Sequence, residues 1–202
     1  MTQRKVGRPA RLDRSNIARA GIAVADRADL AQVTMRAVAA EIGSAPAALY
    51  RHVGDRGELV ALMIDEVLAE KDIVRASGTW QADLAVFAAG LFELYRAHPW
   101  LSTGVLPQTM GPRIGEVTNE AIELLNSHPA PVGRRYAAIA VLLELVSGYA
   151  RSADQVGVSA AKVVEMTGAA AAPHSPRTGA DEDYAIAVII AAVGGVLDAG
   201  SL

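Results

Sequence analysis

The sequence predicts an all-α protein. Apolar residues make up 51% of the 202 residues but aromatic residues only 4%, and this balance favours helix packing over a β-sandwich, whose strands are rich in aromatic and β-branched residues. Apolar residues also recur three and four positions apart along most of the chain, which is the helical period. Gly and Pro separate these periodic runs, as they do between helices.

Composition also excludes several classes of protein. Cysteine is absent, which excludes disulfides, thiolate metal sites and a cysteine nucleophile. The chain shows neither the apolar core of a signal peptide nor an apolar run of about 18 residues, so we expect a cytoplasmic protein that does not contact membranes. His98, His128 and His174 have no metal-ligand spacing and no catalytic triad or carboxylate pair is evident, so we expect neither an enzyme nor a cofactor or metal.

Charge is divided unevenly along the chain. Residues 1–56 hold ten of the 19 Lys and Arg residues and five of the 22 Asp and Glu residues, a local charge of +5 against −8 for the remainder. A basic N-terminal module on an acidic body is expected when only that module meets phosphate. The alternative is a basic tail without a partner.

The N-terminal region predicts a basic arm followed by a helix. Residues 1–11, MTQRKVGRPAR, show no apolar period and are interpreted as a flexible arm. Asp13 is a suitable N-cap for a helix that follows. Its inward positions at helical spacing are Ile17, Gly21, Val24 and Ala28.

Two short helices come next. Thr34 is the predicted N-cap of the first, and Gly43 stands where its C-terminus needs a left-handed residue. Pro46 suits the first position of the second, because its missing N–H is not needed there, and that helix is expected to reach about His52. The inward positions of the first short helix are Met35, Val38, Ala39 and Ile42, and those of the second are Leu49 and Val53.

A capping box, Asp55-Arg56-Gly57-Glu58, opens a longer helix that is expected to reach about Ala76. Leu59, Leu62, Met63 and Val67 form its apolar face.

The rest of the chain continues in the helical pattern, and the last helix is apolar around most of its circumference, which predicts burial on more than one side. The predicted elements are helices at 80–97, from Trp100, at 111–126, at 132–156, near 159–166 and at 181–198, with a loop at 168–179. The inward positions of the helix at 111–126 are Ile114, Val117, Ala121 and Leu125.

Two short helices joined by a glycine-containing turn, with another helix before them, form a helix-turn-helix pattern. The second short helix exposes small residues, Ala47 and Ala48, at its start, so it can approach base edges closely. Tyr50, Arg51 and His52 at its end supply donors for flanking phosphates.

Residues 12–63 resemble the DNA-binding domain of the TetR family. The resemblance is carried by TMRAVAAEIG at 34–43, LYRHV at 49–53 and DRGEL at 55–59. The segment AHPWL at 97–101 and the Gly-Pro pair at 111–112 resemble the subset of that family that includes the tetracycline repressors. This resemblance implies a helix-turn-helix domain at 12–58 and a helical domain at 59–202 for effector binding and dimerisation.

The resemblance assigns roles in binding double-stranded DNA. Thr34 would hold a phosphate at a helix N-terminus, and Arg36 would reach a guanine edge or a phosphate. Tyr50, His52 and Arg56 would contact phosphates, and Arg8 would enter the minor groove. The residues facing the major groove would be Ser44, Ala45, Pro46 and Ala47.

Two positions depart from the family pattern, and several roles have simpler alternatives. Ala45 is a poor N-cap, so either Ser44 or a phosphate must satisfy the free amides, and Arg56 replaces the commoner lysine. The alternatives are that Tyr50 is a core aromatic residue, His52 a helix-end cap, Arg36 a solvated charge and Arg8 part of an unbound tail.

The sequence of the helical domain at 59–202 indicates its effector site and dimer interface less specifically than the helix-turn-helix indicates DNA binding. The resemblance implies an apolar pocket for a small effector, whose candidate residues are Phe87, Leu91, Tyr95, Trp100, Met110, Tyr136 and Tyr149, with ordinary packing as the alternative. Helices 132–156 and 181–198 are the predicted homodimer interface, where Ala191, Ala192, Gly194 and Gly195 would allow close approach. The alternative is that both helices belong to the intramolecular core.

Together these features predict a repressor that binds a palindromic operator as a dimer and is released by a small effector. The first alternative is an activator or a ligand-independent regulator. The second is a helical ligand-binding protein or enzyme with a vestigial helix-turn-helix, against which the intact Thr34, Arg36, Tyr50 and His52 argue.

Overall fold

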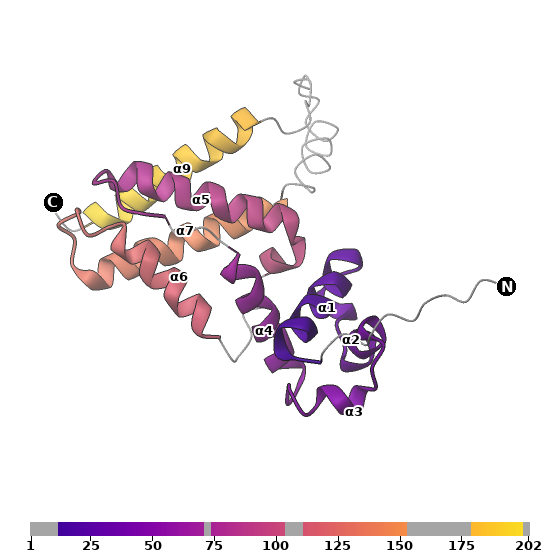
Figure 1. Cartoon of the computed structure of the whole chain (residues 1–202). Coiled ribbons are helices and arrows are strands. Elements are labelled where there is room, and N and C mark those ends of the chain that lie inside the picture. The colour runs from indigo at the N-terminus through magenta and orange to yellow at the C-terminus, as the bar shows by residue number, and fades with distance from the viewer. Residues whose placement is uncertain (1–11, 71–73, 104–110, 153–178, 200–202) are drawn as a thin grey trace, which may run out of the picture. The chain divides into compact units, whose positions relative to one another are not determined.

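The computed structural model describes residues 12–70, 74–103, 111–152 and 179–199, and within these ranges every regular element is a helix. This confirms the predicted fold class. The helices are α1 (Arg14–Arg27), η1 (Leu30–Gln32), α2 (Met35–Ile42), α3 (Pro46–Leu49), α4 (Arg56–Ala69), α5 (Trp80–Ala97), η2 (Pro99–Thr103), α6 (Pro112–Glu123), α7 (Val132–Ser152) and α9 (Gly179–Asp198) (Figure 1). The arm, the helix near 159–166 and most of the loop at 168–179 lie outside the described residues.

The described residues form two compact units. The first contains α1 to α4 with residues 111–114, and the second contains α5, η2, α7, α9 and the rest of α6. The first unit therefore runs on to Glu70, whereas the predicted functional division falls after residue 58. That division stays a prediction.

Side-chain caps begin three helices of the first unit. Asp13 Oδ1 accepts from the Asn16 amide at 2.9 Å, Thr34 Oγ1 from the Ala37 amide at 3.1 Å, and Asp55 Oδ1 from the Glu58 amide at 2.8 Å. Each cap satisfies an amide that has no partner within its own helix. All three caps were predicted from the sequence.

The turn between α2 and α3 depends on a glycine. Gly43 has φ of +71°, the left-handed region that disfavours residues with a Cβ, and the next amide, that of Ser44, donates to Ala39 O at 2.8 Å. Pro46 then begins α3 as predicted. The helix ends at Leu49 and not at His52, because the chain tightens into a turn in which the His52 amide donates to Leu49 O at 2.8 Å.

Helix α1 packs against α2 and α4 in the first unit, and α2 packs against α3. The closest approach is at Gly21, where an added Cβ would lie 2.6 Å from Met63 Sδ. The predicted inward positions are mostly buried, and two are half-buried, Ile42 and Leu62. Ala28 was predicted to face inward but is exposed, because it is the C-cap of α1 and lies beyond the packed helix.

Helix α4 is shorter than predicted. It ends at Ala69, and residues 74–77 are not helical. Their backbone amides have partners from other helices: Val74 donates to Glu120 Oε1 at 2.6 Å, and Ser77 donates to the carboxylate of the buried Asp83 at 2.9 Å. These tertiary hydrogen bonds replace the helical ones that the local pattern predicted.

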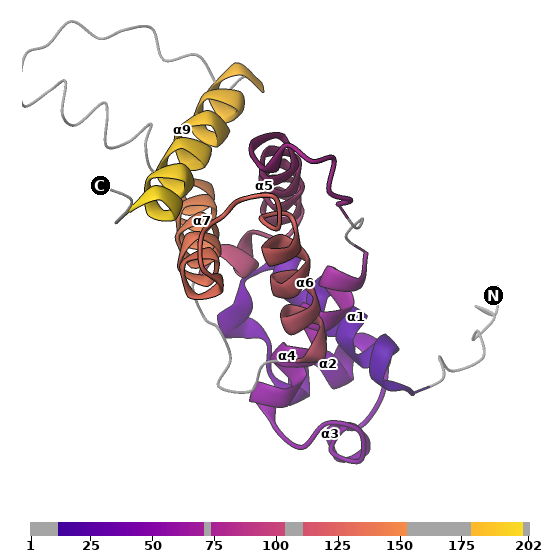
Figure 2. The ribbon, with the colours of Figure 1, turned by 90° about the vertical axis from the view of Figure 1, so that its left-hand side faces the viewer.

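The second unit is a helical bundle in which α5, α7 and α9 pack pairwise (Figure 2). Phe87, Leu142 and Val193 are completely buried in its core. Ala121 of α6 and Leu125 in the turn after it are buried, whereas the predicted inward residues Ile114 and Val117 of α6 are only half-buried. No described helix is apolar over a length that would cross a bilayer.

Helix α9 is buried on one side within the chain. Ala185, Ile189 and Val193 face the bundle, but Tyr184 is 69% exposed and Val188 is 48% exposed. The prediction of burial on more than one side therefore fails for the single chain, because α5 and α7 cover only part of its surface.

Candidate nucleic-acid interface

The helix-turn-helix presents polar side chains outward from α2 and from the end of α3. Arg36 and Arg51 are exposed, and Tyr50 is 56% exposed while Leu49 and Val53 fill the inward face. The alternative that Tyr50 is a core residue is therefore wrong. Neither arginine pairs with an acidic group in the part of the chain that the structure describes, so both positive charges are available to an anionic partner.

Thr34 and Arg36 stand at the start of α2. The Thr34 hydroxyl oxygen accepts from the Ala37 amide, which leaves the hydroxyl hydrogen able to donate to a second acceptor. Arg36 lies two residues further on, in the first turn of this eight-residue helix. A hydroxyl and a guanidinium so placed can both contact a phosphate or a base edge.

Helix α3 begins without a side-chain cap. Its N-cap residue, Ala45, accepts no hydrogen bond through its side chain, and the half-buried Ser44 provides no cap in its place. Of the two predicted ways to satisfy the free amides, capping by Ser44 is therefore wrong. Ala45, Pro46 and Ala47 are all exposed.

His52 is half-buried, and its backbone carbonyl is held by Arg14. The Arg14 Nη1 atom donates to His52 O at 2.5 Å and to Glu58 Oε1 at 2.8 Å. Arg14 thus ties the start of α1 to the turn after α3 and to α4. Sequence reasoning missed this role, because its partners lie 38 and 44 residues away and no local pattern links them.

Arg56 also braces the unit. Its Nε donates to Val33 O at 2.8 Å and its Nη2 to Leu30 O at 2.7 Å, which holds the segment before α2 against the start of α4. This gives Arg56 a structural role that the sequence did not predict. Its phosphate contact stays a prediction.

The capping box at α4 differs from its usual form. Glu58 Oε2 accepts from the amide of Gly54 at 2.7 Å, whereas in the usual box it would reach the amide of the N-cap residue Asp55. The Gly54 amide, and then Arg14, lower the pKa of the Glu58 carboxyl below its ordinary value. Both interactions favour its charged form.

The predicted effector residues differ in their burial, and their role in binding an effector stays a prediction. Three are buried in the second unit, Phe87, Leu91 and Trp100, and burial raises the pKa of the half-buried Tyr95. Tyr136 and Tyr149 are 49% and 37% exposed. Met110 and the predicted minor-groove residue Arg8 lie outside the described residues.

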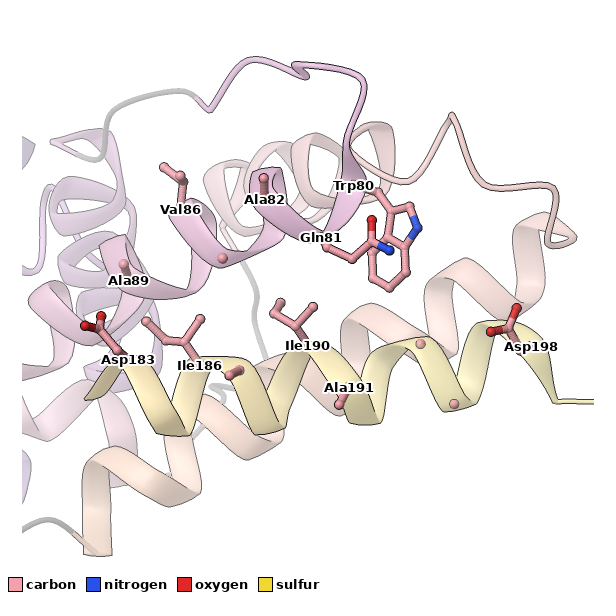
Figure 3. Close-up of a pocket in the computed structure, with 14 residues that line it drawn as sticks. Trp80, Gln81, Ala82, Val86, Ala89, Asp183, Ile186, Ile190, Ala191 and Asp198 are labelled. Carbon is pink, nitrogen blue, oxygen red and sulfur yellow. The ribbon is translucent and has the colours of Figure 1, made fainter. Parts of the chain in front are cut away.

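An open groove of about 950 Å³ lies between α5 and α9 (Figure 3). Trp80, Ile186 and Ile190 contribute its large apolar surfaces, and the carboxylates of Asp183 and Asp198 stand near opposite ends of its wall on α9. None of the predicted effector residues lines it. Sequence reasoning missed the groove because its two walls, residues 80–89 and 183–198, are far apart in the chain and no local pattern links them.

Comparison with known proteins agrees with the helix-turn-helix. The chain is 32% identical over 140 residues to the HTH-type transcriptional repressor DrrR1 of Streptomyces coeruleorubidus, an alignment that covers 68% of this chain and 50% of that protein. It spans half or less of the length of the two curated relatives it matches. No protein-family model matches the chain.

Solved structures match nearly the whole chain. The TetR family protein ActR of Streptomyces coelicolor, crystallised with actinorhodin, gives a TM-score of 0.78 at 22% identity over 96% of this chain and 100% of ActR. BioQ, crystallised with its double-stranded DNA operator, gives a TM-score of 0.63 at 16% identity over 90% of this chain and 99% of BioQ. This chain has the TetR fold. The sequence motifs at 34–43, 49–53 and 55–59, which resemble the TetR DNA-binding domain, lie on α2, on the end of α3 and its following turn, and on the start of α4.

Two regions of the second unit bring aromatic and polar side chains together. One is the open groove beside Trp80. The other is the end of the bundle near Trp100, where Arg151 donates to Ser102 O and Ser147 Oγ and the Phe92 and Tyr149 rings meet edge to face at 6.3 Å. Each place combines aromatic surface with polar groups, which is the usual composition of a ligand site.

Proposed function

We propose that this protein is a TetR-family transcription regulator, a repressor that binds a palindromic operator as a homodimer in the cytoplasm and is released by a small effector. The observation that carries the proposal is the surface formed by α2, α3 and the turn after α3, where exposed Arg36, Tyr50 and Arg51 flank small residues. The likeness to the repressor DrrR1 and to operator-bound BioQ supports the same function.

Arg36 and Tyr50 divide the recognition of DNA between them. A guanidinium can bind a guanine edge with two hydrogen bonds, whereas a phenol at the helix end reaches phosphate. We expect Arg36→Ala to weaken operator binding by about 1–3 kcal/mol and to relax base preference at one position of each half-site. Tyr50→Phe should weaken binding to all sequences by a similar factor and leave base preference unchanged.

The measurement is a gel-shift titration with DNA from beside the protein's own gene and with a scrambled duplex, over a range of salt concentrations. Phosphate contacts make the logarithm of affinity fall steeply with the logarithm of salt concentration. Equal loss across all sequences for both variants would contradict base reading by Arg36. Failure of the wild-type protein to bind any duplex at low salt would contradict the proposal as a whole.

The outer surfaces of α7 and α9 support the homodimer. Val188 is 48% exposed, and Leu145 on α7 is 39% exposed, so apolar side chains of both helices are left uncovered by the chain itself. Ala191 and Gly195 line the groove that faces α5, whereas the exposed Ala192 on α9 would let a second copy approach closely. In sedimentation equilibrium we expect a dimer for the wild type and monomers for Val188→Glu, and a monomeric wild type would contradict this interface.

The effector proposal is tested with the two tryptophans, because each marks one of the two candidate places. Trp80 lines the groove and Trp100 lies at the other place. Trp80→Phe and Trp100→Phe leave one reporter each, and the first probe is actinorhodin, the ligand bound to ActR. Quenching of Trp100 alone favours the predicted residues around Tyr95, quenching of Trp80 alone favours the groove, and release of DNA without either change contradicts both places.

Release of bound DNA by a probe, together with a transcription assay, distinguishes the proposed repressor from a ligand-independent regulator and from an activator. A ligand-independent regulator would keep its operator in the presence of every compound tested. An activator would bind the same duplex but raise transcription from it in a purified assay, whereas the proposed repressor lowers it.

A further inference from the structure

The groove between α5 and α9 carries charge of one sign only. Of the 14 residues that line it, Asp183 and Asp198 are ionisable, Gln81 is polar, and the others are apolar apart from the indole N–H of Trp80 (Figure 3). No described lysine, arginine or histidine lines it. The chain from residue 57 onward also holds nine Lys and Arg residues against 17 Asp and Glu residues. An anion would therefore be repelled here, and the charge that complements the groove is positive.

Trp80 is held in place near one end of the groove. Its ring meets the His128 imidazole edge to face, with 5.7 Å between the ring centroids. A Cβ added at Gly194 would lie 3.5 Å from Cη2 of the Trp80 ring, so the ring lies close against α9. An indole that lines the groove in this fixed position offers it aromatic surface, which attracts cations.

Asp198 stands at the same end of the groove and keeps its negative charge. His128 Nδ1 accepts from the Ala130 amide at 3.1 Å, which requires a neutral ring with its proton on Nε2. That nitrogen lies 3.4 Å from Asp198 Oδ1, so a neutral donor and not a cation faces the carboxylate. Among the described residues the carboxylate has no other ion-pair partner.

The end of α9 adds to the negative potential at Asp198. This residue is the last of the helix, where free carbonyls carry partial negative charge. Arg134 Nη1 donates to one of these carbonyls, Leu197 O, at 3.1 Å. A carboxylate at this end of a helix does not stabilise the helix, and a cation bound beside Asp198 would relieve the repulsion.

From this end the groove continues as an apolar channel toward Asp183. Ile190 and Ile186 line its α9 wall between the two carboxylates (Figure 3). Asp183 is exposed and forms no ion pair within the described part of the chain. Because Asp183 and Asp198 are fifteen residues apart on one helix, their backbones are separated by about 22 Å. The α5 wall opposite is lined by the small residues Ala82, Ala85 and Ala89.

We propose that this groove binds elongated amphipathic cations. A quaternary or protonated amine lies between Trp80 and Asp198, and an alkyl or aromatic body extends over Ile190 and Ile186. A second cationic group at the far end of a longer molecule reaches Asp183. This inference rests on the proposed function in one respect, since it names the ligand class for one of the two candidate effector places.

The test uses full-length protein carrying Trp100→Phe, so that Trp80 is the single tryptophan and its fluorescence reports binding in the groove. Three probes share a decyl chain and differ in the charge of the head group. They are decyltrimethylammonium, decyl(dimethyl)amine oxide with no net charge, and decyl sulfate, each below its micelle concentration. We expect the cation to bind about tenfold more tightly than the amine oxide, from the aromatic contact and the ion pair together. Decyl sulfate should bind most weakly.

Asp198→Asn should weaken binding of the cation by about fivefold, through loss of the ion pair, and should leave binding of the amine oxide unchanged. Glu123→Gln is the matched control, because it removes an exposed carboxylate of α6 that does not line the groove. This control should change neither affinity.

The two carboxylates also predict a dependence on length. Bis(trimethylammonium) alkanes of increasing spacer length should bind more tightly once the second ammonium group reaches Asp183, about 22 Å from the first. Asp183→Asn should abolish this gain and leave decyltrimethylammonium binding unchanged. A gain that Asp183→Asn does not alter would overturn the proposed course of the molecule along the groove.

Equal binding of the cation and the amine oxide, or equal losses with Asp198→Asn and Glu123→Gln, would overturn the cation site. Adding Val188→Glu tests whether a second copy fills the groove, and cation binding only in the presence of this change would overturn a ligand site in the dimer. Gel shift of the same preparations, with an operator that the protein selects from a random DNA pool, tests the proposed function separately. DNA binding without cation binding overturns only the cation site, and cation binding without DNA binding overturns only the proposed function.

Discussion

The two units of the molecule are held together by different interactions. In the first unit α2 and α3 have only eight and four residues and lie between α1 and α4, which have 14 residues each. Asp13, Thr34 and Asp55 cap α1, α2 and α4, and Arg14 and Arg56 join these elements. In the second unit α5, α7 and α9 span 18, 21 and 20 residues and share one apolar core. Short helices need polar terminal contacts, because one or two turns bury too little apolar surface to persist.

Polar terminal contacts and apolar packing suit the different functions that we propose for the two units. A DNA-reading surface requires fixed side-chain positions, which caps and arginine hydrogen bonds provide. A ligand-responsive bundle requires helices that can shift past one another, and apolar packing permits discrete rearrangements of that kind. The comparison predicts that apolar truncation damages the second unit most and that loss of single polar contacts is felt mainly in the first.

The largest effect is expected in the core of the second unit. Phe87 is completely buried, while its neighbour Val86 is 60% exposed. Phe87→Ala should lower the free energy of unfolding by about 3–5 kcal/mol, and Val86→Ala by less than about 0.5 kcal/mol. Both tryptophans belong to this unit, so denaturant titration followed by tryptophan fluorescence reports its unfolding. Similar losses for the two variants would show that the core assignment is wrong.

Replacing a glycine by alanine should lower the stability of the first unit at Gly21 and raise that of the second unit at Gly90. A Cβ at Gly21 would lie 2.6 Å from Met63 Sδ, whereas a Cβ at Gly90 in α5 would meet no described atom within 4 Å. Gly21→Ala should cost about 1–3 kcal/mol through overpacking, and Gly90→Ala should stabilise α5 by about 0.5–1 kcal/mol. Hydrogen exchange of the α1 and α5 amides measures each unit separately, and the same sign at both sites would contradict the close approach of α1 and α4.

Two threonines test the role of the caps. Thr34 caps α2, but Thr79, at the same position before α5, makes no side-chain cap hydrogen bond. Thr34→Ala should destabilise the first unit by about 1 kcal/mol, and Thr79→Ala should change the second by less than about 0.5 kcal/mol. Exchange rates of the α2 and α5 amides provide the measurement. If Thr34→Ala changes the exchange of the α2 amides no more than Thr79→Ala changes that of the α5 amides, the Thr34 cap does not stabilise α2.

The smallest effect concerns pH. The pKa of Glu58 lies below its ordinary value of 4.5, first because of the Gly54 amide and then because of Arg14. Its charged form therefore stabilises the first unit above pH 4.5, and this contribution is lost as the pH falls through the lowered pKa. Glu58→Gln should be less stable than wild type by under about 1 kcal/mol near neutral pH, since the carboxylate is solvent-screened. Thermal melting between pH 7 and pH 3 should show the gap closing, and a pH-independent gap would contradict the assignment.

Sequence reasoning succeeded where the determinants are local. Asp13, Thr34, Gly43, Pro46 and Asp55 each act on residues within a few positions, and each begins or ends a helix where predicted. It failed where partners are distant in the chain. The extension of α4 to Ala76 was wrong, because Glu120 and Asp83 bind the amides of Val74 and Ser77.

The candidate functional surfaces also include parts that local sequence patterns predict and parts that depend on distant residues. The exposed positions of α2 and α3 follow from the periodicity of two short helices, so Arg36 and Tyr50 could be singled out from the sequence. The bracing by Arg14 and Arg56 and the groove beside Trp80 could not, because each joins segments from separate helices.

Hydroxyl-radical footprinting of this protein on its selected operator tests whether α2 and α3 of two copies read duplex DNA. We expect two protected patches related by twofold symmetry on one face of the duplex, with centres about 34–36 Å apart or a multiple of this. Arg36→Ala should weaken both patches together. A single unsymmetrical patch, or uniform protection without sequence preference, would contradict DNA reading by two copies of α2 and α3.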